Sequence, residues 1–128
     1  MRHSRSAGFT LIELLVVVVI IGILASIAIP KFSNTKGKSY AAAIKSDLRN
    51  LATAEESYYY SNDTYTADLG ALNFNPTAGV TITISEATAG GWGATATRPG
   101  ASVNSCALFF GSVAPVAPAT VEASIVCN

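Results

Sequence analysis

The chain has 128 residues, of which 50% are hydrophobic and 12% are charged, and it carries no formal net charge. This length allows one small domain and one long additional element. The balanced charge gives no indication of a nucleic-acid partner. The high apolar fraction predicts that some of the surface faces lipid or another subunit.

The segment from Phe9 to Ile29 is largely apolar and follows a short, basic stretch at residues 1–8. As a helix, about 21 residues span roughly 31 Å, which is close to the ~30 Å hydrocarbon core of a bilayer. The segment is therefore able to cross a membrane. Three interpretations are open: a plain anchor, a secretory signal peptide cut after Ala28, or a leader that is cut ahead of the apolar run.

Glu13 favours the last interpretation. A carboxylate inside a membrane segment costs free energy and is rarely retained without a use. If the chain is cut after Gly8, Phe9 gains a free α-amine, and Glu13 of a neighbouring subunit can pair with it. In a low dielectric such a pair would be strong and would fix the register between subunits. The alternative is that Glu13 lies at headgroup level and pairs with nothing.

The run Gly8-Phe9-Thr10-Leu11-Ile12-Glu13 and the apolar stretch behind it resemble the class III signal of type IV prepilins and type II secretion pseudopilins. The resemblance covers about the first 30 residues. It implies cleavage between Gly8 and Phe9 by a membrane prepilin peptidase, N-methylation of Phe9, and a requirement for Glu13 in assembly. His3, the one histidine, would be lost with the leader.

Gly22 and Pro30 are weak points of the predicted helix. Proline lacks the N–H that the helix needs, and glycine costs about 1 kcal/mol relative to alanine. The resemblance implies that the stretch between them loosens when subunits pack in a filament. A simple curved helix is the alternative.

One helix is predicted from about Thr10 to Tyr60, apolar all round in its first half and amphipathic in its second. The predicted packing face holds Tyr40, Ala41, Ile44, Leu48, Leu51, Ala52, Tyr58 and Tyr59. The face expected to be polar holds Ser39, Lys45, Asp47, Arg49, Glu55 and Glu56.

Beyond the helix, the pattern predicts a loop over residues 61–79 and then alternating strands. The expected strands are Val80–Ser85, Trp92–Thr97, Cys106–Phe110 and Thr120–Cys127. The fold class is therefore α+β, with one long helix packed on a small antiparallel sheet, as in type IV pilins. We divide the chain into a leader (1–8), a transmembrane or assembly helix (9–30) and a globular head (31–128).

Cys106 and Cys127 allow only one pairing. A bridge would close a loop of about 20 residues and contribute roughly 3 kcal/mol in the chain-entropy model, and it would require an oxidising compartment. Two buried free thiols are the alternative. A C-terminal bridge of this kind also resembles that of many pilins.

The sequence contains no glycine-rich phosphate loop and no CxxC pair, so we expect neither enzymatic activity, nor a cofactor, nor a metal. Asp63 and Asp68 are able to bind Ca²⁺ weakly, but solvated loop acids are favoured because no alternating acidic motif is present. Lys31, Lys36 and Lys38 either contact anionic lipid headgroups or form a solvated positive flank.

The expected function is structural: a subunit of a type IV pilus-like filament that assembles as a helical homopolymer. A pseudopilin of a type II secretion system is the alternative, and a small periplasmic binding module is a third hypothesis from another class. The expected partners are other copies, the prepilin peptidase, the inner membrane and the assembly machinery. The precursor is expected to span the inner membrane once with its head outside the cytoplasm, and the filament to lie at the cell surface.

Overall fold

The computed structural model describes residues 8–128 of the chain and contains two compact units, the residues up to Asn34 and Thr35–Asn128. Residues 1–7 of the predicted leader lie outside the described residues. Helix α1, Leu11–Asn62, contributes to both units.

The helix begins and ends within two residues of the predicted bounds, Thr10 and Tyr60. At its C-terminal end Asp63 adopts a positive φ of 55° and donates its backbone N–H to Tyr59 O at 2.8 Å. Aspartate is one of the few residues that tolerate this left-handed conformation. Asn62 also caps the end, because its Nδ2 donates to Tyr58 O at 2.9 Å.

Four strands follow: β1 (Thr81–Thr88), β2 (Gly91–Thr97), β3 (Cys106–Gly111) and β4 (Val126–Cys127). They form one antiparallel sheet in the order β1-β2-β3-β4. A register shift between Ile84 and Glu86 interrupts the β1–β2 ladder, and β1 continues beyond it to Thr88. The predicted α+β class, with one long helix and an antiparallel sheet, is confirmed.

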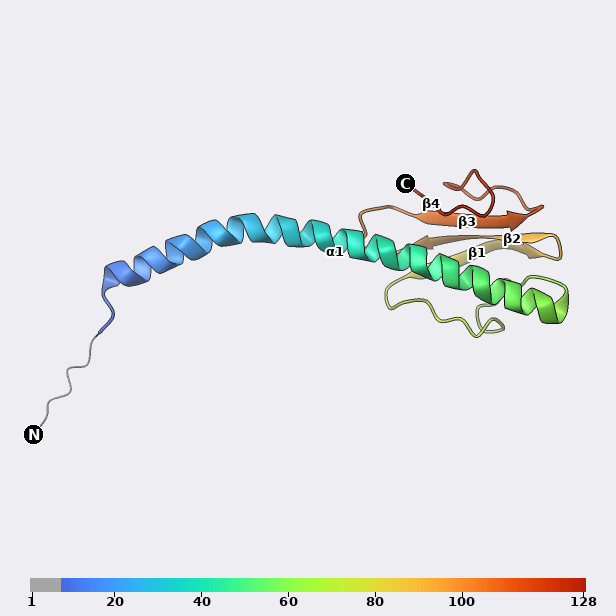
Figure 1. Cartoon of the computed structure of the whole chain (residues 1–128), viewed down its shortest axis with the longest axis horizontal. Helices are drawn as coiled ribbons and strands as arrows, with labels where there is room; N and C mark the ends of the chain where they lie inside the picture. The colour runs from blue at the N-terminus through green and yellow to red at the C-terminus, as the bar shows by residue number, and fades with distance from the viewer. Residues whose placement is uncertain (1–7) are drawn as a thin grey trace, which may run out of the picture. The chain divides into compact units, whose positions relative to one another are not determined.

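In the unit from Thr35 onward, the second half of α1 lies along one face of the sheet (Figure 1). Ile44, Leu48 and Leu51 are fully buried there. The sheet meets them with Ile82, Trp92, Ala94, Ala96, Cys106 and Leu108. Because two of these positions in β2 are alanines, the helix backbone is able to approach the middle of the sheet closely.

The last strand is shorter than predicted. The sequence pattern predicts a strand over Thr120–Cys127, but only Val126–Cys127 pairs with β3. Ala123 adopts a positive φ of 59°, and its N–H bonds to Phe109 O at 3.0 Å. A left-handed residue turns the chain away from the extended path, so a ladder cannot run through it.

The helix also departs from the predicted division of its two faces. The periodicity predicts Asp47 and Glu55 on the polar face, yet they are 4% and 0% exposed. Glu55 lies four residues after Leu51 and continues the buried stripe of the helix. Both carboxylates have hydrogen-bond partners in the loop that follows the helix, which explains how they are accommodated.

Candidate functional site

The first half of α1 presents an exposed apolar surface. Phe9, Leu11 and Phe32 are 85%, 81% and 73% exposed, and no side chain between residues 8 and 34 is buried. The helix contains a stretch of mean hydropathy 3.0, long and apolar enough to cross a membrane. An apolar surface of this extent requires lipid or other protein around it.

Thr10 and Glu13 form a capping box at the start of α1. Glu13 Oε2 accepts the backbone N–H of Thr10 at 2.9 Å and its hydroxyl at 2.8 Å, while Glu13 N–H donates to Thr10 Oγ1 at 3.3 Å. Such reciprocal bonds satisfy two backbone donors that a helix start otherwise leaves free. Sequence reasoning missed this role, although the spacing Thr-x-x-Glu signals it.

The capping box uses only one oxygen of the Glu13 carboxylate. Both bonds to Thr10 end on Oε2, which leaves Oε1 available to a group from outside the described chain. A local role in helix capping and a role between subunits are therefore compatible. Glu13 by itself no longer argues against a plain anchor, because an anchor helix would also gain from the cap.

The Gly8–Phe9 junction precedes the helix in irregular, exposed backbone. Apart from adjacent residues and nearby helix backbone, no described atom lies within 4 Å of where a Cβ on Gly8 or Gly22 would lie. The described chain therefore does not require glycine at these positions. Pro30 lies inside α1, and the helix continues through it.

Two buried carboxylates hold the loop after the helix against the head. Asp47 accepts the Thr77 N–H at 2.8 Å and its hydroxyl at 2.9 Å. Glu55 Oε2 accepts the Thr66 N–H at 3.2 Å, but Glu55 Oε1 has no partner. Burial raises the pKa of Glu55 from its usual 4.5, and the bond from Thr66 only partly offsets that rise.

Tyr65, in the loop after the helix, packs against the last turns of α1. Its ring stacks on Tyr59 at 4.6 Å between centroids, and its hydroxyl donates to Glu56 Oε1 at 2.9 Å. Burial and the Glu56 carboxylate raise the pKa of Tyr65 to about 12. Tyr58, on the predicted packing face, packs against the core, whereas Tyr60 is 92% exposed.

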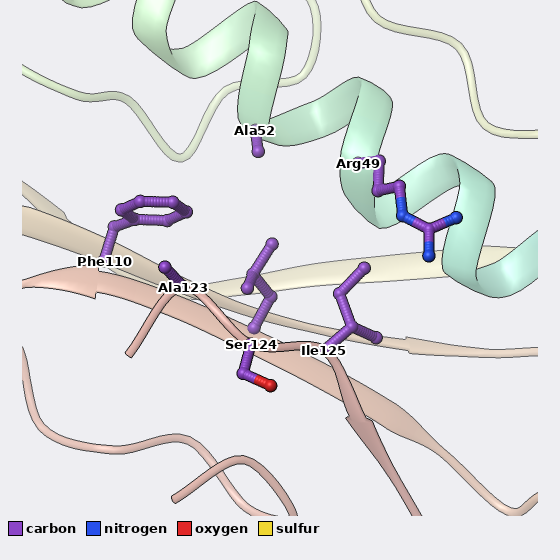
Figure 2. Close-up of a pocket in the computed structure, with 7 residues that line it drawn as sticks. Arg49, Ala52, Phe110, Ala123, Ser124 and Ile125 are labelled. Carbon is purple, nitrogen blue, oxygen red and sulfur yellow. The ribbon is translucent and has the colours of Figure 1, made fainter. Parts of the chain in front are cut away.

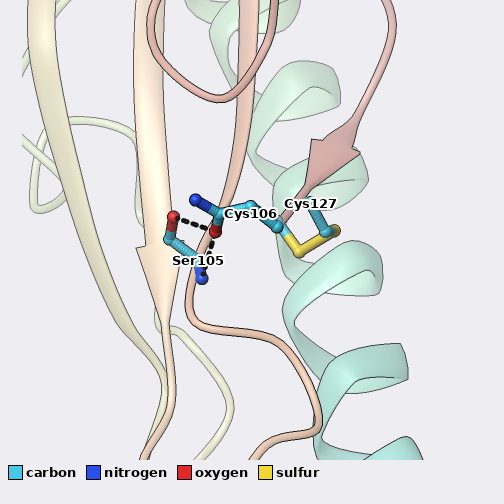
Figure 3. The surroundings of a disulfide bond; sticks show 4 residues. Ser105, Cys106 and Cys127 are labelled. Atoms are coloured by element: carbon cyan, nitrogen blue, oxygen red, sulfur yellow. Dashed lines mark hydrogen bonds between the residues drawn. A yellow bond between two sulfur atoms is a disulfide. The ribbon is translucent and has the colours of Figure 1, made fainter.

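The disulfide that the two cysteines allow is present (Figure 3). Cys106 and Cys127 face each other in the β3–β4 ladder. Next to the bridge, Asn128 Oδ1 accepts the backbone N–H of Ser105 at 3.2 Å and its hydroxyl at 3.1 Å. The bridge and these bonds fix the C-terminal segment to the edge of the sheet.

A concavity of about 460 Å³ lies in the head between α1, β3 and residues 123–125 (Figure 2). Arg49 and Ala52 border it on the helix side, and Phe110 and Ile125 on the other. Its lining includes no pair of groups for nucleophilic or acid–base chemistry. Among residues 8–128, no cluster of His, Cys, Asp or Glu is arranged to hold a metal ion.

Comparison with known proteins identifies the N-terminal segment. Residues 3–29 match the model of the prokaryotic N-terminal methylation motif. The type IV major pilin protein PilA of Myxococcus xanthus is 44% identical over 77 residues, which is 60% of this chain and 35% of that protein. The type II secretion system core protein G of Aeromonas hydrophila is 40% identical over 81 residues, 61% of this chain and 57% of that protein.

The chain is similar to type IV pilins and type II secretion pseudopilins. The type IV major fimbrial protein FimA of Dichelobacter nodosus is a further relative, 49% identical over 53 residues, 41% of this chain and 34% of that protein. The chain thus spans between about a third and just over half of the length of these three relatives. They are pilin and secretion-system subunits rather than enzymes. An apolar N-terminal helix and a methylation motif fit a membrane-anchored pilin precursor.

Proposed function

We propose that this protein is the structural subunit of a type IV pilus-like filament. The observation that carries the proposal is the methylation motif at residues 3–29, joined to a helix half whose large apolar side chains are exposed. In a filament, the helices of neighbouring subunits would cover that surface, and apolar burial would hold them together. The heads would form the outside of the filament.

Processing precedes assembly in this proposal. A membrane prepilin peptidase on the cytoplasmic side cuts between Gly8 and Phe9 and methylates the new N-terminus. The irregular, exposed backbone at this junction supports access by such an enzyme. The precursor spans the inner membrane once, with the head on the oxidising side, where the disulfide is stable.

Glu13 would then set the stagger between subunits. Its Oε1 would accept the Phe9 amine of a neighbour while Oε2 keeps the cap with Thr10. In the apolar core of a filament an unpaired carboxylate is costly, so only the correct stagger would satisfy it. Gly22 and Pro30 would allow the helix to loosen locally as the subunits pack.

A pseudopilin of a type II secretion system is the second candidate. The similarity to core protein G over 61% of this chain favours it. Both candidates use the same processed helix and the same self-assembly, and they differ in the machinery that extends the filament. Deleting the gene in the producing organism separates them, because one predicts loss of surface pili and the other retention of secreted proteins in the periplasm.

Two substitutions separate the charge of Glu13 from its capping role. Glu13→Gln keeps an acceptor for Thr10, since glutamine also serves in a capping box, but it removes the charge. Thr10→Ala removes the cap and keeps the charge. We expect Glu13→Gln to lower the yield of sheared filaments at least about tenfold, as loss of a desolvated ion pair would. Thr10→Ala should lower it much less.

The amount of subunit in the membrane is the control and should stay unchanged in both variants. If Glu13→Gln assembles normally while Thr10→Ala does not, Glu13 acts as a helix cap and the proposed pairing with Phe9 is wrong.

A further inference from the structure

The charges of the head are separated along the helix. Within residues 35–128, all cations of α1 lie between Lys36 and Arg49, and the next charged residues, Glu55 and Glu56, are acidic. The cations in this range are Lys36, Lys38, Lys45, Arg49 and Arg98. The carboxylates are Asp47, Glu55, Glu56, Asp63, Asp68, Glu86 and Glu122.

Arg98 follows β2 directly but joins the cations of the helix. Its guanidinium lies 3.7 Å from the centroid of the Tyr40 ring, and Lys36 Nζ lies 5.7 Å from the same centroid. Two cations thus share one aromatic ring at the Thr35 end of the head. Cation–π contacts offset part of the repulsion between these two side chains.

The carboxylates outside the helix gather at the Asn62 end. Glu86 lies on β1 opposite Gly93, two residues before the strand ends at Thr88. The Thr88 carbonyl accepts the backbone N–H of Tyr65, which lies in the loop just after the helix. Glu122 Oε1 accepts the backbone N–H of Gly111. Gly111 pairs with Gly91, which pairs with Thr88 at the same end of the sheet. Within the helix, Asp47 is the one carboxylate that lies among the cations, and both of its oxygens accept bonds from Thr77.

We infer that the acidic end of one head docks onto the basic end of another copy of this chain, head to tail. This inference rests on the proposed function and adds to it the surface by which the heads recognise each other. Like charges gathered at each end repel within one subunit, and a neighbour of opposite charge relieves both. A head-to-tail contact uses two different surfaces, so it continues into an open filament.

Zero-length carbodiimide cross-linking of sheared wild-type filaments tests the contact. Along the helix, Lys36 and Glu55 are about 28 Å apart, so a direct bond from Lys36 or Lys38 to an acid at the far end must join two copies. We expect peptide mass spectrometry to find links from Lys36 or Lys38 to Glu86, Asp63 or Glu122. Filaments in which these lysines link to none of those acids would overturn the inference.

Charge reversal with reciprocal rescue provides the second test. Lys36→Glu with Lys38→Glu, or Glu86→Lys with Asp63→Asn, should each lower filament yield at least about fivefold, and combining all four should restore most of it. Asparagine is chosen at residue 63 because it tolerates the positive φ. Lys36→Arg with Lys38→Arg is the matched control and should assemble normally.

The outcomes distinguish a failure of the head-to-tail docking from a failure of the proposed filament function. If the lysine reversals reduce assembly and the acidic reversals do not rescue it, the basic end serves another partner, such as anionic lipid, and the inference is wrong. If wild-type cells make no filament at all, the proposed function fails and this inference fails with it.

Discussion

Glu55 is a polar side chain fully enclosed in the core of the head, 0% exposed, with one oxygen unpartnered. The indole N–H of Trp92, also 0% exposed, has no partner either. Unsatisfied buried groups reduce stability. The core is therefore packed around polar groups that are only partly satisfied.

Stability should fall as pH rises through the titration of Glu55. Its folded pKa is raised above the usual 4.5, so between these two values the folded chain holds more protons than the unfolded chain. The free energy of unfolding then decreases with rising pH, and the loss is complete above the folded pKa. Glu55→Gln should remove this slope and raise the melting temperature at pH 7 by a few degrees.

Thermal unfolding of the full chain in detergent, measured from pH 4 to pH 8, checks the prediction. Glu86→Gln is the matched control, since Glu86 is exposed, and it should keep the slope. Parallel profiles for wild type and Glu55→Gln would show that the burial of Glu55 does not govern the pH dependence.

Asp47 joins the helix to a residue 30 positions later through two bonds to Thr77. Asp47→Ala would leave the Thr77 donors without their acceptor and should cost about 2 kcal/mol of stability. Asp47→Asn keeps an acceptor and should cost less. Denaturant unfolding measures both, and an Asp47→Ala variant as stable as the wild type would mean that water replaces the carboxylate freely.

At the scale of elements, sequence patterns predict the helix and the first three strands to within a few residues. Periodicity and alternation determine these elements, because each buries one apolar face. The pattern fails where a single residue controls the backbone, as Ala123 does in the segment before β4. It also fails at Asp47 and Glu55, since a charged residue gives no signal that a distant loop will satisfy it.

The disulfide should stabilise the head by constraining its last segment. Because β4 has only two residues, the ladder alone holds it weakly. Replacing Cys106 and Cys127 by serine should cost roughly 3 kcal/mol, as expected for a loop of about 20 residues. Denaturant unfolding with and without a reductant checks this, and an unchanged midpoint after reduction would contradict it.

At the scale of the whole molecule, the motif at Gly8–Glu13 by itself indicates a resemblance to type IV pilins and pseudopilins, and the comparisons with known proteins bear out that similarity. The fold adds the capping box, which gives Glu13 a role within its own helix. It also adds the separation of charge along the head. Linear sequence shows the order of the charges, but only the fold places Arg98, Glu86 and Glu122 at their respective ends.

The central claim is that the chain is processed at Gly8–Phe9 and assembles through the helix that follows. Mass spectrometry of the N-terminal peptide from sheared surface material tests it most directly. The account predicts a terminus at Phe9 that carries one methyl group, in a chain whose Cys106 and Cys127 are bridged. A terminus at Ile29 would contradict it, because the apolar helix would then have been removed as a signal peptide and would be unable to form the core of a filament.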